Sequence, residues 1–433
     1  MRVSEFNQNP PGVSFYLAIA GGVAGWNEIA LHLWMLLPAA AVSAGVYVLA
    51  KRMNADGVMA ALLAVTAPGF VVSASTLMAD VLMLALYTWC VLLWIQGLDM
   101  RSRTMLGASA ACGAAAILTK YFAVSLVPLL LVYTIARERR PASHWWWLAV
   151  PVLVLGAYQW HTARLYGHSL FSSAAAYAAG NSEGGVTSLG VTLAGLCFAG
   201  GCFAGIGFAA PIVWRRRALA GWMLVAALSI AAVGLVPGFV AAPDVTKLSA
   251  ASYVLAGAFI AGGIHVFAVA GLVLRRERSA ETLLLLLWLG GTFVFSVFVN
   301  WTVNARSLLP MIVPASIFLA KALPSGPAVN HGQWGRWMPV AVAAVLSMAV
   351  SYGDYQLAGA SRDAAAQLGE KYRGDAEHTW FEGHWGFQYY LEREGFRALD
   401  YTRLDRLAAG DRVIIPSHNT NVRYFDPALA REI

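Results

Sequence analysis

Long apolar runs alternate with short polar stretches over residues 28–352 of the chain. A helix crosses the hydrocarbon core of a bilayer with roughly 20 mostly apolar residues. On that measure the pattern predicts an all-α bundle of about twelve transmembrane helices. The expected spans are 28–50, 57–73, 75–98, 104–119, 121–136, 145–161, 189–213, 219–237, 251–274, 281–299, 306–323 and 335–352. The pairs 57–98 and 104–136 must each fold back within a short stretch, and Pro68-Gly69 and Lys120 mark the expected reversals.

The tail has a different pattern, with mixed helix and strand signals and a higher density of charge. We therefore predict two domains, a membrane domain over 1–352 and a small soluble α/β domain over 353–433. Because a segment of this size folds alone only marginally, we expect it to pack against the outer face of the bundle. The predicted elements of the tail are a helix over 361–372, a strand over 378–381, a helix over 387–394 and a strand over 412–416.

Composition agrees with a polytopic membrane protein. Hydrophobic residues make up 59% of the chain, charged residues only 12%, and the mean hydropathy is +0.61. The net charge of +7 follows mainly from basic loops, so it does not indicate a nucleic-acid partner. The four cysteines all lie inside predicted spans without metal-ligand spacing, which argues against disulfides and zinc sites.

Basic residues orient the bundle, because Lys and Arg in short loops accumulate on the cytoplasmic side. The basic loops alternate with loops that carry almost no Lys or Arg, which supports the span count independently. The loops predicted to be cytoplasmic contain Lys51, Arg52, Arg101, Arg103, Arg137, Arg139, Arg140, Arg215 to Arg217, Arg275, Arg276, Arg278, Lys321 and Arg336. The opposite loops hold only Arg2, Lys120, Arg164, Lys247 and Arg306. Both the first 27 residues and the tail are thus expected outside.

An outer N-terminus needs a preceding span or an N-out helix, and Met1 to Gly25 contains neither a signal peptide nor a full span. We expect a first span to be missing from this sequence. The segment from Val13 to Ala24 is too short to cross the membrane, so we expect it to lie along the outer interface.

Three charged residues stand on the predicted outer face, where charge is otherwise rare. Asp80 begins one span, Lys120 lies between two, and Arg306 begins another. Each has a simpler explanation: Asp80 as a helix N-terminal carboxylate, and Lys120 and Arg306 as cations that extend to the interface. Together they favour a site for a lipid-linked phosphate, because cations neutralise a phosphate and a carboxylate can act as a base or hold a divalent metal ion.

Two further groups of residues have less specific interpretations. Tyr121, Trp301 and Tyr352 could stack on a sugar or a prenyl unit, although an interfacial aromatic belt also explains them. The tail segment from His378 to Gly386 holds two His, one Glu and two Trp, without an established metal-ligand spacing. We expect it to have a structural or acceptor-contacting role.

Several short motifs, in this order, resemble glycosyltransferase family 39, which has the GT-C fold. They are Asn9-Pro10-Pro11, the segment from Ser73 to Asp80, Leu118-Thr119-Lys120-Tyr121, and Asn304-Ala305-Arg306-Ser307-Leu308-Leu309-Pro310. The resemblance covers nearly the whole chain. It implies transfer of a sugar from a polyprenyl-phosphate donor to a lipid, glycan or protein acceptor at the outer face of the plasma (inner) membrane, with a periplasmic C-terminal domain.

We predict that Asp80 is catalytic, orienting the acceptor or a metal ion, and that Asn9, Lys120, Tyr121 and Arg306 bind the substrate. The motifs require no cofactor. A divalent metal ion is the cofactor that the Asp80 carboxylate could hold. Family members carry an acidic residue just after the first span, and this sequence does not contain that position; some have Lys where this chain has Asn9.

Two other classes of function stay open at this stage. A catalytically silent relative or lipid-binding subunit would keep the phosphate site without transferring a sugar. A secondary transporter would need charges at the middle of the membrane and corresponding broken helices in two halves, whereas the charges here cluster at one face.

Overall fold

The computed structural model describes residues 9–138, 143–180, 188–214, 216–235, 249–324, 335–400 and 407–416. Its contacts divide the chain into two compact units, residues 1–348 and 349–433. The loop pattern predicted above includes five residues that lie outside the described residues: Arg2, Arg139, Arg140, Arg215 and Lys247.

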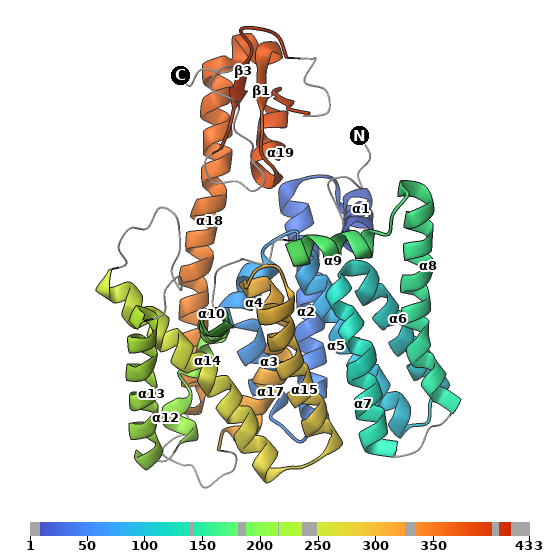
Figure 1. Cartoon of the computed structure of the whole chain (residues 1–433), viewed down its shortest axis with the longest axis vertical. Helices are drawn as coiled ribbons and strands as arrows, with labels where there is room; N and C mark the ends of the chain where they lie inside the picture. Colours follow the sequence, from blue (N-terminus) through green and yellow to red (C-terminus); the bar gives the residue numbers. More distant parts are fainter. Residues whose placement is uncertain are drawn as a thin grey trace. The chain divides into compact units, whose positions relative to one another are not determined.

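Among the described residues of the first unit, every regular element is a helix (Figure 1). Its first half contains α1 (Gly12–Ala24), α2 (Glu28–Arg52), α3 (Gly57–Val65), α4 (Pro68–Ala74), α5 (Ala79–Asp99), α6 (Arg103–Thr119), η2 (Tyr121–Ser125), α7 (Leu126–Glu138), η3 (Ser143–Leu148), α8 (Ala149–Tyr166) and α9 (Leu170–Gly180). Its second half contains α10 (Ser188–Cys202), α11 (Ala204–Gly207), α12 (Ala210–Val213), α13 (Arg216–Leu235), α14 (Ala250–Arg276), α15 (Ala280–Val294), η4 (Phe295–Val299), α16 (Ala305–Leu308), η5 (Leu309–Met311), α17 (Ile312–Ala322), η6 (Gly335–Trp337) and the start of α18 (Met338–Tyr372).

The predicted polytopic helical membrane protein is confirmed. Among the described residues, 8 helices are long and apolar enough to cross a membrane, or up to 10 if two bent helix pairs each count as one span. The remaining two predicted spans correspond to α6 and to η3 with α8. The predicted short segment before the first span is α1, a 13-residue apolar helix. At 1.5 Å per residue it reaches only about 20 Å, which is too short to span.

The most enclosed spans are α5 and the segment from α16 to α17. In their most apolar windows 72% and 83% of residues are buried, against 39% in α2. Large side chains such as Trp94 and Phe318 fill the space around these two segments. Asp80 lies in the first turn of one segment and Arg306 in the first turn of the other. The best-packed part of the bundle therefore supports both residues.

The chain bends at Pro68 but does not reverse there, which corrects the predicted reversal at Pro68-Gly69. Helices α3 and α4 form one broken span with a bend of 65°. Pro68 occupies the first turn of α4, and Ala67 before it adopts an extended conformation with ψ of 132°. A residue that precedes proline disfavours the helical region, so the break falls at Ala67. The direction changes later, between α4 and α5.

A second expected straight span, 189–213, is broken at Phe203. The segments before and after the break differ in direction by 91°. Glycines at 200, 201, 205 and 207 weaken the helix, and Gly200 and Gly263 bring the backbones of α10 and α14 into close contact. His265 Nδ1 lies 2.8 Å from the Ile206 carbonyl oxygen at the break and satisfies it. Backbone packing between two helices thus stabilises a bend that apolar periodicity does not predict.

Ion pairs at one end of the first unit join residues from the loops predicted to be cytoplasmic. Asp99, at the end of α5, pairs with both Arg52 and Arg137. Three further pairs belong to the same set of loops: Arg137 with Glu281, Lys321 with Glu277, and Arg336 with Asp56. These pairs link five of the loops, and their partners can meet only if the loops share one end of the bundle. The basic loops joined by these pairs therefore lie together at one end of the bundle, as the sequence predicts.

The second unit contains the end of α18, η7 (Arg373–His378), β1 (Thr379–Phe381), α19 (Trp385–Arg393), β2 (Arg397–Ala398) and β3 (Arg412–Ile414). The strands form a parallel sheet in the order β2-β1-β3. Phe381, Phe387 and Leu391 form its core. The predicted strands and second helix are present, but the predicted helix 361–372 is the end of a continuous 35-residue helix, and β2 was not predicted.

Asp411 accepts three hydrogen bonds in the second unit. Its carboxylate accepts hydrogen bonds from Ala408 N, His378 Nδ1 and Trp380 Nε1 at 3.0, 3.0 and 2.8 Å. These bonds lower the pKa of Asp411, the backbone bond most strongly. A lowered pKa stabilises the fold above the ordinary carboxyl pKa of about 3.9, and that stability is lost as the pH falls through the folded value.

We therefore expect hydrogen-exchange protection of β1 in the full chain, corrected for intrinsic rates, to fall as the pH drops below about 4. Asp411→Asn should reduce protection at pH 7 and remove part of the acid step. An acid profile that is the same in both proteins would show that Asp411 is not responsible.

Candidate functional site

Asp80 is a buried carboxylate at the start of α5. Its side chain is 1% exposed and lies in the first turn of the helix, where the helix dipole favours a negative charge. Two cations contact it, one at each oxygen: Lys120 Nζ is 2.5 Å from Oδ1, and Arg306 Nε is 2.9 Å from Oδ2. The carboxylate is therefore stabilised by these two cations in addition to the helix dipole. Its burial is compensated by two ion pairs.

The end of α6 positions Lys120. The Lys120 amide donates to Ala116 O at 2.9 Å and closes the helix, while its carbonyl accepts from Ala123 N at 3.0 Å and starts η2. Between these two bonds Lys120 is extended, with φ of −154° and ψ of 130°. Its side chain is 28% exposed. The backbone is thus fixed on both sides, and the ammonium group contacts Asp80 while part of the side chain stays accessible.

A short capped helix positions Arg306. The side chain of Asn304 accepts a hydrogen bond from Ser307 N at 2.8 Å and caps α16. The Arg306 side chain is 49% exposed, and its contact with Asp80 uses only Nε. The two terminal nitrogens of the guanidinium can serve other acceptors, such as the oxygens of a phosphate.

The three residues form a cluster with one negative and two positive charges. The carboxylate is enclosed, whereas both cations keep accessible surface. The cluster is separate from the ion pairs around Asp99. Asp99 lies at the other end of the same 21-residue helix, about 30 Å away. A net positive, partly accessible cluster in the membrane suits an anionic ligand.

Tyr121 lies next to Lys120 and contacts α8 and α9. Gln159 Nε2 lies 3.3 Å from the Tyr121 hydroxyl, and the Phe171 ring lies edge-on at 5.2 Å between centroids. Gln159 Oε1 also accepts from Ser169 Oγ and from Phe171 N, both at 2.9 Å. Gln159 therefore joins Tyr121 to the start of α9, which runs across the direction of the long helices in Figure 1. This role of Gln159 is not predicted from the sequence, although an amide near the end of an apolar span is a signal for it.

Three other predicted residues, Asn9, Trp301 and Tyr352, lie in different parts of the fold. Asn9 precedes α1 by three residues, and Gly12 of α1 packs against Leu118 and Thr119 at the end of α6. Asn9 thus belongs to the same end of the bundle as Lys120. Trp301 contacts the Tyr177 ring of α9 edge-on at 5.8 Å. Tyr352 belongs to the second unit and accepts a hydrogen bond from Gln356 at 2.8 Å.

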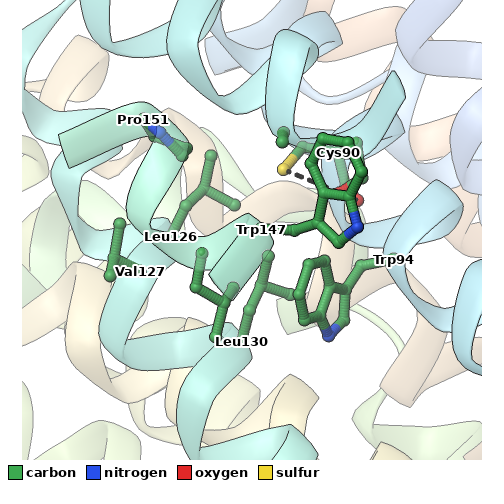
Figure 2. A pocket seen from close by; sticks show the side chains of 10 residues that line it. Cys90, Trp94, Leu126, Val127, Leu130, Trp147 and Pro151 are labelled. Atoms are coloured by element: carbon green, nitrogen blue, oxygen red, sulfur yellow. Dashed lines mark hydrogen bonds between the residues drawn. The ribbon is translucent and has the colours of Figure 1, made fainter. Parts of the chain in front are cut away.

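A cavity elsewhere in the bundle is apolar and separate from these charges. It is lined by residues of α5, α6, α7, η3 and the start of α8, and Figure 2 shows Cys90, Trp94, Leu130, Trp147 and Pro151 around it. Cys90 lies ten residues beyond Asp80 on α5, or about 15 Å along the helix. The part of the chain that the structure describes contains no group of three or more His, Cys, Asp and Glu side chains that could hold a metal ion.

Residues 8–160 match the family model described as dolichyl-phosphate-mannose-protein mannosyltransferase. The predicted family resemblance is confirmed over this segment. It contains Asn9, Asp80, Lys120 and Tyr121, and Arg306 lies outside it. The match supports a glycosyltransferase kind of activity.

Three solved structures are similar to the chain at low identity. An oligosaccharyltransferase from Archaeoglobus fulgidus, tethered with an acceptor peptide, is 14% identical with a TM-score of 0.49, over 90% of this chain and 55% of that one. ArnT from Cupriavidus metallidurans bound to undecaprenyl phosphate is 16% identical with a TM-score of 0.45, over 94% of this chain and 79% of that one. Its apo form gives the same TM-score and identity over 93% and 79%. The chain thus spans about half the length of the oligosaccharyltransferase, and a search of curated proteins gave no match.

Proposed function

We propose that the protein transfers a sugar from a polyprenyl-phosphate donor, and that the Asp80, Lys120 and Arg306 cluster binds the phosphate of that donor. The observation that carries the proposal is the pairing of one buried carboxylate with two partly exposed cations at one end of the bundle. The family match over residues 8–160 supports the reaction class.

The chemistry of the donor explains why two cations are needed. When the sugar leaves, negative charge develops on the phosphate oxygen that held it. Donors already fixed beside that oxygen stabilise the charge without rearrangement. Lys120 offers a compact ammonium group, and Arg306 offers a planar fork for two phosphate oxygens. Both retain accessible surface, so a phosphate can approach without breaking the contacts to Asp80.

Asp80 has a positioning role in this proposal. Both of its oxygens accept hydrogen bonds from the cations, so we assign it to holding Lys120 and Arg306 at a fixed separation. Without a carboxylate, two like charges would repel each other and move apart. Tyr121, and Asn9 at the start of α1, would line the same end and contact the donor or the acceptor.

The orientation follows from the basic loops. If the end around Asp99 is cytoplasmic, the Asp80 end faces outward. The reaction then takes place at the outer face of the plasma membrane, on a lipid, glycan or protein acceptor, and the C-terminal unit is extracytoplasmic.

Arg306→Met tests the proposal, with Arg164→Met as its control. Arg164 also belongs to a predicted outer loop, and its guanidinium lies 4.1 Å from the centroid of the Trp160 ring, an arrangement typical of an interfacial arginine. In vesicles given a panel of polyprenyl-phosphate hexoses and pentoses, Arg306→Met should lower transfer at limiting donor by roughly 10- to 100-fold, the loss expected for a charge-assisted hydrogen bond. Arg164→Met should transfer sugar as the wild type does.

Equal transfer by the two variants would contradict the role of Arg306. If the wild-type protein bound undecaprenyl phosphate but transferred none of these sugars, the lipid-binding subunit would replace the enzyme as the better description.

A further inference from the structure

We propose that Gly12 is a positioning residue for Lys120: the first turn of α1 presses against the last turn of α6 and thereby fixes the ammonium group beside Asp80. The significance of this contact for donor binding rests on the function proposed above. The inference adds a residue on α1 that touches neither the three charges nor the ligand they would bind.

The contact between α1 and α6 leaves no room for a side chain at position 12. A Cβ atom there would lie 2.5 Å from Thr119 Oγ1, 2.7 Å from Leu118 O and 2.8 Å from Thr119 Cα. All three distances are shorter than Cβ atoms tolerate, and two involve backbone atoms of α6. Glycine is therefore required for close approach of the two backbones.

The atoms that face Gly12 are held in place. Thr119 Oγ1 donates a hydrogen bond to Ala115 O at 2.8 Å, so the hydroxyl cannot turn away without losing that bond. Thr119 is buried, and Leu118 O belongs to the helix itself. A Cβ at position 12 would consequently shift the backbone of α1 or of the last turn of α6.

Helix α1 has its own attachments, which resist a shift on its side. The Tyr16 hydroxyl donates to Trp34 O of α2 at 2.9 Å, and Gly21 packs on the Trp26 ring beyond the end of α1. The displacement would then fall largely on residues 118 and 119, directly before Lys120. A displaced ammonium group would make a longer and weaker hydrogen bond to a bound phosphate, so the affinity for the donor would fall.

A mutant cycle in the full-length protein tests the inference, with binding of undecaprenyl phosphate in nanodiscs as the readout. Gly12→Ala should weaken binding by roughly 10-fold when Lys120 is present, and should have no further effect in a Lys120→Ala background. Gly22→Ala is the matched control, because a Cβ at this position of the same helix meets nothing within 4 Å. Its binding should equal that of the wild type.

The cycle separates two kinds of failure. If Gly12→Ala weakens binding equally in both backgrounds, or not at all while Lys120→Ala does, Gly12 does not act through Lys120 and only this inference is wrong. If Lys120→Ala leaves binding unchanged, the proposed phosphate site is wrong, and the inference falls with it.

Thr119→Ala examines the same contact from the α6 side without adding an atom, in case Gly12→Ala does not fold. It removes the hydroxyl that faces Gly12 and its bond to Ala115 O. Binding should weaken a few-fold only when Lys120 is present. An equal loss in the Lys120→Ala background would again contradict the inference.

Discussion

Lys120→Met is expected to weaken binding of undecaprenyl phosphate by roughly 10- to 100-fold. The ammonium group is the phosphate ligand in the account above, and a hydrogen bond to a charged group is worth about 1.5–3 kcal/mol. Methionine keeps most of the length and apolar volume of the side chain, so packing at the end of α6 should persist. Titration of the purified full-length protein in nanodiscs measures the effect.

Lys51→Met is the control for this loss. Lys51 lies at the last turn of α2, at the end of the bundle that carries the Asp99 ion pairs, and its ammonium group is 5.7 Å from the centroid of the Tyr47 ring. The substitution removes the same charge from the other end. Binding as weak in Lys51→Met as in Lys120→Met would mean that overall charge, and not a local phosphate site, governs affinity.

Asp80→Asn is expected to reduce the rate of sugar transfer at saturating donor by roughly 100-fold, without weakening binding of undecaprenyl phosphate. The amide keeps the shape of the carboxylate but not its charge. Without the negative charge the two cations repel each other and move from the positions that stabilise the leaving phosphate. The net positive charge of the cluster is greater, so it still attracts the phosphate. Rate and affinity should therefore change separately, and steady-state kinetics together with the binding titration would show it.

Asp99→Asn provides the comparison on the same helix. Asp99 also pairs with two cations, Arg52 and Arg137, but at the other end of α5. Loss of these pairs should lower the melting temperature and leave transfer per folded molecule unchanged. A loss of transfer that is similar in both variants would assign Asp80 a role in stability alone.

The sequence is sufficient to predict most helices, because each membrane span has to satisfy its own backbone hydrogen bonds and needs a long apolar run. Residues expected at the ends of spans, such as Asp80 and Arg306, indeed lie in the first turns of helices. The sequence does not predict that Asp80, Lys120 and Arg306 contact one another. Lys120 is 40 residues from Asp80, and Arg306 is 226 residues away, so packing of α5 against its neighbours brings them together.

The departures from the predicted elements have local causes that hydropathy does not report. The bend at Phe203 depends on close contact of α10 with α14 and on a hydrogen bond from His265, on a helix distant in sequence. Helix α18 continues through residue 352 to Tyr372, although Gly353 and Asp354 follow that position. Strand β2 has only two residues, too few for a periodic signal.

A structure of the full-length protein with undecaprenyl phosphate, determined by electron cryo-microscopy, would show whether the phosphate binds at this cluster. We expect phosphate oxygens within about 3 Å of Lys120 Nζ and of the Arg306 guanidinium, with Asp80 still paired to both cations. A phosphate bound elsewhere, with these three side chains unchanged and out of its reach, would contradict the proposed phosphate site.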